Sequence, residues 1–322
     1  MITAQTDSGY QIEIPLFFNG YEILCYLSNG CFSVVLKVQN INNHQIFVAK
    51  VISKIDMINK NNLNEIYNEI MIHKFLNHNN IVKLYDSFSI INEKQEELIV
   101  IIEEYCKNGD LSIYIKQNSL LNNYDKKRIE CGIISAVKYL HHNSIAHCDI
   151  KPENILLDHN LNPKLCDFSL SIKCSQYSRH LNLKGDIWSI GITLYIINKK
   201  DQKLNKKCDH LSLETSNKKL KNIIEKCTSF NINNRPDIEN LYNDGYFSIP
   251  DEEKENDCNS IVDSDLDFHY FELSIDFQSK IDMKQNKYKK PKKKNKKKKK
   301  LIKYKLIVRC YDDENQNFFV VN

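Results

Sequence analysis

The stretch SIAHCDIKPENILLD, residues Ser144 to Asp158, crowds polar side chains between two apolar segments. An amphipathic helical pattern over residues 126–142 leads into it, and the apolar run Ile155–Leu157 leads out of it. The polar residues between them are His147, Asp149, Lys151, Glu153 and Asn154, interrupted by Pro152. Such a turn is expected to face phosphate and metal, because an aspartate orients or deprotonates a hydroxyl, a lysine neutralises phosphate and an asparagine oxygen ligates Mg²⁺.

The chain around this turn divides into a strand-rich part and a helical part. Strand patterns occupy residues 21–52, as YEILCYL, FSVVLKVQ and QIFVAKVI, and they recur in IVKLYDSFSI and ELIVII. Residues 62–77 carry apolar side chains at roughly helical spacing. After Cys106 the pattern becomes helical and ends near Phe247. The sequence therefore predicts an α+β fold, with a small antiparallel β lobe that carries one helix and a larger helical lobe.

A second aspartate belongs with the polar turn. The segments ILLD and PKLCD are short enough to pair as a hairpin, and this hairpin ends at Asp167 in KLCDFS. Asp149, Asn154 and Asp167 are then expected to converge in the cleft between the two lobes.

Further segments stand in a fixed order around these residues. Lys50 follows Gly30 by 20 residues, and Asp149 precedes Asn154 by five. The segments are FVAKVI with Lys50, IYNEIMIHKFLNHNNIVKLYDSF with Glu69, EEYCKNGDL from Glu103 to Leu111, HCDIKPEN, DFS from Asp167 to Ser169, DIWSIG from Asp186 to Gly191, and NNRPDIENL. In order and spacing, the chain over roughly residues 20–247 resembles the eukaryotic protein kinase family.

The resemblance implies a bilobal protein kinase fold that transfers the γ-phosphate of ATP, with Mg²⁺, to hydroxyl groups of a protein substrate. Asp149 would orient the attacking hydroxyl, and Lys151 would steady the transferred phosphoryl group. The place of this lysine, two residues after the aspartate, resembles the Ser/Thr class. Asn154 and Asp167 would hold the metal. The residues implied in nucleotide binding are Leu27, Gly30, Val35, Lys50, Glu69, Glu104, Cys106, Asp110 and Leu156.

The chain departs from the family pattern in the phosphate-binding loop, the catalytic turn, the metal motif and the adenine pocket. Gly30 is the one glycine present of the three in the phosphate-binding loop, which is expected to weaken ATP binding. Cys148 replaces the arginine that normally pairs with a phosphorylated activation segment, so activity is not expected to need phosphorylation there. Ser169 replaces the glycine of the metal motif. Glu103 places a carboxylate deep in the adenine pocket, where it would narrow the pocket or bond locally.

The segment between Asp167 and Asp186 is much shorter than family members usually show, and it holds no Ala-Pro-Glu. The resemblance implies that the platform for a peptide substrate lies there, with a glutamate that pairs with an arginine in the position of Arg235. We therefore expect Arg235 to meet solvent or another carboxylate, because a buried unpaired charge is costly. Two hypotheses stay open: a Ser/Thr protein kinase, and a nucleotide-binding pseudokinase that acts as a scaffold or regulator.

Charge is distributed unevenly along the chain. The formal net charge is +4, but 14 lysines and no acids lie between Lys284 and Lys305. We expect an N-terminal extension over 1–20, a kinase domain over 21–247, an acidic linker over 248–283, a disordered lysine arm over 284–305 and a short segment over 306–322. The arm has three interpretations: a nuclear address, an electrostatic binder of nucleic acid, anionic lipid or another polyanion, or a by-product of AAA-rich coding.

The remaining composition predicts the compartment. The 11 cysteines form no Cys-x-x-Cys pair and no zinc-like spacing, which is typical of reduced thiols. No apolar run approaches the roughly 18 residues of a membrane span, and the N-terminus lacks the basic-then-apolar order of a secretory signal. The sequence therefore predicts an intracellular protein without a transmembrane segment, located in the cytoplasm, the nucleus or both.

Overall fold

The computed structural model describes residues 1–60, 62–117, 121–175, 179–199 and 217–247. Contacts divide the chain into two units, Met1–Pro250 and Asp251–Asn322. All of the described residues belong to the first unit. The predicted acidic linker, lysine arm and C-terminal segment lie outside the described residues.

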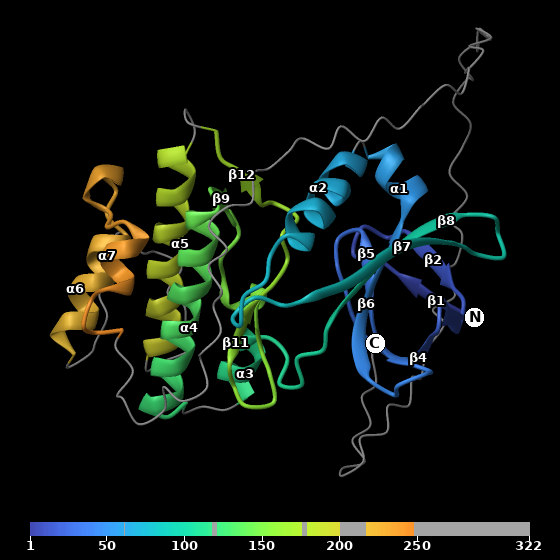
Figure 1. The fold of residues 1–322 in the computed structure, drawn as a ribbon, viewed down its shortest axis with the longest axis horizontal. Helices are drawn as coiled ribbons and strands as arrows, with labels where there is room; N and C mark the ends of the chain where they lie inside the picture. Colours follow the sequence, from blue (N-terminus) through green and yellow to red (C-terminus); the bar gives the residue numbers. More distant parts are fainter. Residues whose placement is uncertain (61, 118–120, 176–178, 200–216, 248–322) are drawn as a thin grey trace, which may run out of the picture. The chain divides into compact units, whose positions relative to one another are not determined.

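A six-stranded antiparallel sheet forms the small lobe (Figure 1). The strand order is β3-β4-β5-β6-β8-β7, and every pairing is antiparallel. The strands are β3 (Phe17–Phe18), β4 (Tyr21–Asn29), β5 (Ser33–Asn40), β6 (Ile46–Ser53), β7 (Leu84–Ile91) and β8 (Glu97–Glu104). The antiparallel β lobe predicted from the sequence is confirmed.

Strand β8, which lies between β6 and the edge strand β7, is buried on both faces, which explains its unbroken apolar run. Alternate side chains of a strand point to opposite faces of the sheet. Ile99 and Ile101 pack on one face with residues of helices α1 (Lys54–Asn59) and α2 (Leu63–Lys74). The opposite face carries Leu98, Val100 and Ile102 in a second buried cluster. The sequence predicted α2 but did not separate the shorter α1 from the strand before it.

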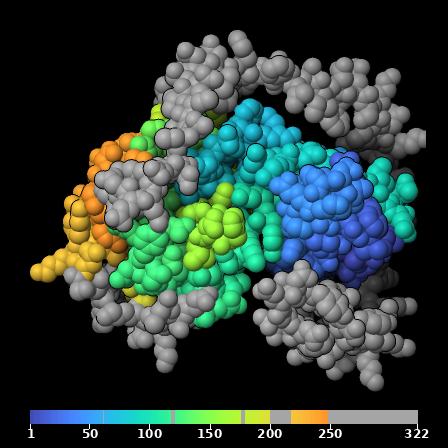
Figure 2. All heavy atoms as spheres, turned by 60° about the horizontal axis from the view of Figure 1, so that its bottom comes forward, coloured from blue at the N-terminus to red at the C-terminus, as the bar shows by residue number. Residues whose placement is uncertain are grey.

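An N-terminal hairpin covers this second face. Its strands β1 (Ile2–Gln5) and β2 (Gln11–Ile14) pair antiparallel. Ile12 and Ile14 are fully buried and belong to the same cluster as Val100. In Figure 2 the first residues, in dark blue, form one continuous block with the lighter blue strands that follow. The predicted extension over 1–20 is therefore packed into the small lobe.

Five α-helices build the described part of the larger lobe (Figure 1). The side chain of Asn122 caps the longest predicted helix, because it accepts the N–H of Asp125 at 2.7 Å. The helix that carries Asp186 begins at Arg179. The helices are α3 (Leu111–Gln117), α4 (Asn123–His142), α5 (Arg179–Asn198), α6 (Lys218–Cys227) and α7 (Ile238–Tyr242).

Short elements hold the polar turn on top of α4 and α5. Strand β9 (Ile145–Ala146) precedes the turn and pairs with β12 (Ile172–Lys173). The turn ends in a 3-10 helix, η1 (Pro152–Asn154), and a second one, η2 (Ile232–Asn234), precedes α7. Strands β10 (Ile155–Leu157) and β11 (Pro163–Leu165) form the predicted hairpin.

The end of the larger lobe is fastened to α4. The hydroxyl of Tyr246 donates to Glu130 Oε2 at 2.9 Å, and Cys131 Sγ donates to the carbonyl of Phe247 at 3.0 Å. These contacts join the last described residues to the larger lobe. Among the described helices, none combines the length and apolar character that a membrane span requires.

Candidate active site

Lys50 on β6 lies at the centre of a charged network. Its Nζ is 2.6 Å from Glu69 Oε1 on α2 and 3.7 Å from Asp167 Oδ1, which follows β11. Burial by itself lowers the pKa of Lys50, but the charges of Glu69 and Asp167 outweigh burial, so the pKa lies above its ordinary value. At Asp167 burial favours a higher pKa, yet Lys50 and the Ser169 amide hold the pKa below its usual value. The site therefore carries an ammonium group between two carboxyl groups.

Asp149 organises the catalytic turn. Lys151 Nζ lies 2.7 Å from Asp149 Oδ2. Because η1 turns the chain back on itself, Asn154 Nδ2 donates both to the carbonyl and to Oδ2 of Asp149, each at 2.8 Å. The amide nitrogen of Asn154 is thus committed to Asp149, and its Oδ1 is the atom left for a cation. The structure brings Asp149, Lys151 and Asn154 together as predicted.

Asp186 holds this turn from below. Its two carboxylate oxygens accept the N–H groups of His147 and Cys148, each at 2.9 Å, and it also lies 2.9 Å from His141 Nε2. These bonds fix Cys148 at a φ of 65°, a conformation that costs free energy for any residue with a side chain. Asp186 therefore positions the backbone of the turn.

His147 is a packing residue. Its ring lies 5.1 Å from the ring of Phe168, and its Nε2 is 3.1 Å from the carbonyl of Cys166. Burial lowers the pKa of His147, so the ring is neutral. In that state Nε2 donates to the carbonyl, and Nδ1 can accept the N–H of Asp149, 3.3 Å away.

The phosphate-binding loop joins β4 to β5. The N–H of Gly30 donates to the carbonyl of Ser33 at 2.8 Å. A Cβ added at Gly30 would come within 2.5 Å of Ser33 Oγ, so a larger residue would force this turn to shift. Of the other predicted residues on these strands, Leu27 is half exposed and Val35 lies opposite Lys50 in the sheet register.

The remaining predicted nucleotide residues lie at the end of β8, in the segment after it and in β10. Glu104 pairs with Lys164 at 2.8 Å, and Asp110 caps α3 by accepting the N–H of Ile113 at 2.8 Å. Asp110 and Leu156 form a backbone bridge. Cys106 is buried, and burial raises the pKa of its thiol to about 12, so the thiol stays protonated and packs as a small apolar group. No ligand contact tests these four roles.

Glu103 bonds locally, to a partner that sequence reasoning missed. Its Oε1 lies 3.4 Å from Nδ1 of His73, which is buried near the end of α2. The other ring nitrogen of His73 lies 2.6 Å from the carbonyl of Val82, so both ring nitrogens face acceptors. The His73 ring also lies 4.7 Å from the ring of Phe168. The signal was present in the sequence only as a polar residue one turn after Glu69 on an otherwise apolar helix face.

The donors at the site fit Mg²⁺. The carboxylate of Asp167 and the amide oxygen of Asn154 are the hard oxygen ligands that Mg²⁺ prefers. In the part of the chain that is described, no three His, Cys, Asp or Glu side chains gather as a self-sufficient metal site. Mg²⁺ commonly takes one or two protein carboxylates and completes its shell with water and phosphate oxygens. Asp167 and Asn154 therefore suit an ion that enters with a nucleotide.

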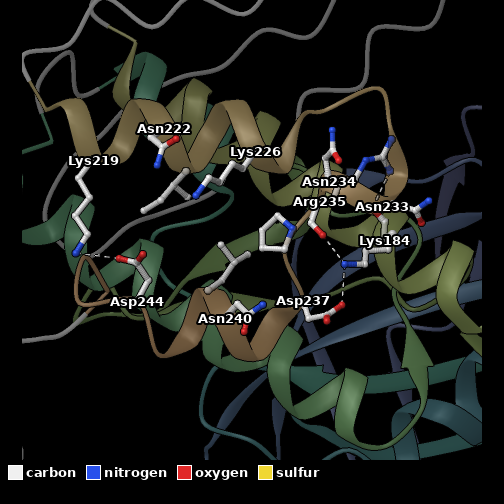
Figure 3. A pocket seen from close by; sticks show the side chains of 13 residues that line it. Lys184, Lys219, Asn222, Lys226, Asn233, Asn234, Arg235, Asp237, Asn240 and Asp244 are labelled. Carbon is white, nitrogen blue, oxygen red and sulfur yellow. Dashed lines mark hydrogen bonds and ion pairs between the residues drawn. The ribbon is translucent and has the colours of Figure 1, made fainter.

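Arg235 lines a cavity of about 520 Å³ in the larger lobe (Figure 3). Its Nη1 and Nε donate to the carbonyls of Lys184 and Ser229, both at 2.9 Å, and its guanidinium lies 4.8 Å from the ring of Trp188. The nearby carboxylate of Asp237 pairs instead with Lys184 Nζ at 2.7 Å, and that Nζ also donates to the carbonyl of Arg235. Of the two expectations, solvent or another carboxylate, the structure agrees with solvent, because Arg235 is partly exposed. Main-chain carbonyls and an aromatic ring supply the remaining contacts of its guanidinium.

Comparison with known proteins places this geometry in a family. The model of the protein kinase domain matches residues 21–264. Serine/threonine-protein kinase SIK1 of Rattus norvegicus is 32% identical over 213 residues, which cover 60% of this chain and 26% of that protein. The carbon catabolite-derepressing protein kinase of Saccharomyces cerevisiae is 34% identical over 197 residues, which cover 55% of this chain and 30% of that protein. The matches thus span about a quarter to a third of these relatives. With a family model matched over most of its length, this chain belongs to the protein kinase domain family.

Proposed function

We propose that this chain is a Ser/Thr protein kinase that transfers the γ-phosphate of ATP to hydroxyl groups of a protein substrate. One observation carries the proposal: the side chains needed for this chemistry meet although they are far apart in the sequence. Lys50 lies 2.6 Å from Glu69 and 3.7 Å from Asp167. Asp149 lies within hydrogen-bond distance of the side chain of Asn154, and the N–H of Cys166, the residue before Asp167, donates to the carbonyl of Asn154 at 3.0 Å. The Ser/Thr kinases among the curated relatives support the same conclusion.

The residues divide the work by charge. Lys50, oriented by Glu69, would bind the phosphates of ATP. Asp167 and Asn154 would hold Mg²⁺, which neutralises phosphate charge when bound. Lys151 and Asn154 both bond Oδ2 of Asp149, which leaves Oδ1 to accept the proton of the attacking hydroxyl. Lys151 would then neutralise the charge on the transferred phosphoryl group.

A phosphate-transfer assay with radiolabelled ATP and a generic protein substrate tests the proposal. We expect Asp149→Asn to reduce transfer by about a thousandfold, because it removes the proton acceptor. The same variant should keep its thermal stabilisation by Mg-ATP. Asp86→Asn, an exposed change on β7, serves as the control and should leave transfer unchanged. Equal transfer by wild type and Asp149→Asn would contradict the proposed mechanism.

One observation favours the alternative, a nucleotide-binding pseudokinase. The chain passes from β12 into α5 at Arg179, so the helix takes residues that the family uses for its peptide platform. Stabilisation by Mg-ATP that Asp167→Asn abolishes, together with no transfer by the wild type, would establish this alternative. Transfer by the wild type that Asp149→Asn abolishes would exclude it.

The proposed setting is intracellular, in the cytoplasm, the nucleus or both. The thiols of Cys31, Cys106, Cys131, Cys148, Cys166, Cys174 and Cys227 form no disulfide, which supports a reducing compartment. We also propose, on charge alone, that the lysine arm over 284–305 binds nucleic acid or another polyanion. Deleting residues 284–300 should remove this binding without changing phosphate transfer to the generic substrate.

A further inference from the structure

The turn of the N-terminal hairpin is bonded to the tip of the phosphate-binding loop. The N–H of Asp7 donates to the carbonyl of Gly30, and the N–H of Ser8 donates to the carbonyl of Cys31, both at 3.1 Å. The turn is closed by the N–H of Thr6, which donates to the carbonyl of Tyr10 at 2.8 Å. Two segments that are far apart in the chain therefore meet through main-chain hydrogen bonds.

These bonds orient two peptide planes of the loop. The carbonyl of Gly30 and the N–H of Cys31 belong to one planar trans peptide unit, so they point in opposite directions. The same holds for the carbonyl of Cys31 and the N–H of Phe32. With both carbonyls turned to the hairpin, both N–H groups point away from it. Successive main-chain N–H groups that point the same way form a binding site for anions such as phosphate.

The hairpin is a firm support, because the rest of it is anchored to the sheet. Its buried Ile12 and Ile14 pack under the strands. Glu13 pairs with Lys94 at 2.8 Å, and its carbonyl accepts Nδ2 of Asn92 at 3.2 Å, which joins the hairpin to the β7–β8 turn. The hairpin is therefore anchored to the sheet independently of the loop tip, and it can hold the loop tip in place.

The far side of the loop tip is anchored by a side chain. Phe32 packs against the cluster that includes Met57 and Ile66 of the two helices, and Lys60 Nζ lies 4.6 Å from the centre of its ring. The loop tip is thus held by the hairpin through its carbonyls and by the α1 region through Phe32.

We propose that Asp7 and Ser8 are positioning residues for the phosphates of ATP. They fix the N–H groups of Cys31 and Phe32 toward the triphosphate in a loop that lacks two of the family's three glycines. A binding site that is ordered before the ligand arrives loses less conformational entropy on binding, so affinity rises. The proposal rests on the proposed nucleotide-binding function and deepens it.

Ser8 offers a precise perturbation. Its Oγ lies 3.5 Å from Oδ2 of Asp56, a buried carboxylate in the first turn of α1. Ser8→Asp would place a second carboxylate against the first, and the repulsion should lift the turn off the loop. Ser8→Asn introduces a side chain of nearly the same shape as aspartate but without its charge, and it is the matched control. Asp56→Asn in the Ser8→Asp background should relieve the repulsion.

Two measurements on the full chain test the proposal. Hydrogen exchange without nucleotide should show protected amides at Asp7 and Ser8 in the wild type and faster exchange in Ser8→Asp. Calorimetry with Mg-ADP should show a dissociation constant that is roughly fivefold to thirtyfold larger for Ser8→Asp than for the wild type. Each of the two lost hydrogen bonds is worth about a factor of five in affinity. Ser8→Asn and the double variant should bind like the wild type.

The outcomes distinguish a failure of the positioning role from a failure of the proposed nucleotide-binding function. Faster exchange at Asp7 and Ser8 with an unchanged dissociation constant would overturn the positioning role. Unprotected Asp7 and Ser8 amides in the wild type would overturn the contact itself. A wild type that binds no nucleotide while these amides are protected would overturn the proposed function instead, and the positioning role would fall with it.

Discussion

Replacing Glu103 by leucine should destabilise the small lobe, because the side chain belongs to a largely buried ion pair. The Glu103 side chain is 15% exposed and the His73 side chain 1% exposed, so the ion pair between them is largely desolvated. Burial by itself works against both charges, but each group supports the other, so the pKa of His73 lies above 6.5 and the pKa of Glu103 lies below 4.5. Both groups are therefore charged over a range of pH, and Glu103→Leu leaves His73 without its counterion.

The magnitude follows from this geometry. Removing one partner of a buried ion pair costs about 3 kcal/mol or more, because the other charge stays buried. For a domain of this size, about 3 kcal/mol corresponds to a melting temperature lower by roughly 6–12 °C. The double variant His73→Leu/Glu103→Leu replaces the pair with apolar groups and should have nearly the stability of the wild type.

The pH dependence has a definite sign. His73 has a folded pKa above its unfolded value of 6.5, so it stabilises the folded protein fully at a pH below 6.5. This stabilisation is lost as the pH rises through the folded pKa. Glu103 has a folded pKa below its unfolded value of 4.5, so it stabilises the folded protein at a pH above 4.5. This stabilisation is lost as the pH falls through the folded pKa. Urea unfolding at pH 6 and pH 9 should therefore show a larger difference between wild type and Glu103→Leu at pH 6. An equal difference at both values, or a double variant less stable than either single variant, would refute the reasoning.

Three further predictions test other parts of the chain. Gly30→Ala should weaken Mg-ADP binding about tenfold in calorimetry, because the added methyl group strains against Ser33 Oγ by about 1–2 kcal/mol. Adding Ser33→Ala should restore the affinity. A double variant that binds as weakly as Gly30→Ala would contradict the steric cause. Arg235→Lys should lower the free energy of unfolding by about 2 kcal/mol in urea, since it loses a carbonyl contact and the stacking on Trp188; an unchanged value would show that these contacts add nothing. Deleting 284–300 should abolish RNA binding that weakens steeply with salt, and retained binding would place the polyanion site elsewhere.

The sequence predicted the fold class and the gathering of the charged residues, for a physical reason. The regular alternation of apolar residues encodes strands and helices locally. Phosphate and metal chemistry needs carboxylate, amide and ammonium groups at a turn, so Asp149, Asn154 and Asp167 were visible as a set. The roles of the individual nucleotide-binding residues stay predictions, because no contact with a nucleotide tests them.

The sequence did not predict which partner each unusual polar group would find. Glu103 stood out as a carboxylate in an apolar place, but its bond to His73 joins residues from different elements. Arg235 was expected to meet solvent or another carboxylate; it is partly exposed, and the sequence did not predict that two carbonyls and Trp188 contact its guanidinium. Such pairings depend on how helices and strands pack, and no local period in the sequence encodes them.

By itself, the sequence determined the kinase fold, because the order and spacing of its motifs resemble that family and local periodicity encodes its strands and helices. Which side chains carry the chemistry stays a prediction. Tertiary structure alone decided that residues 1–14 complete the small lobe. The apolar strand β8 needs cover on both faces, and the hairpin that buries Ile12 and Ile14 supplies the second cover. That packing also brings Asp7 and Ser8 onto the phosphate-binding loop, a contact between distant segments that exists only once both have folded.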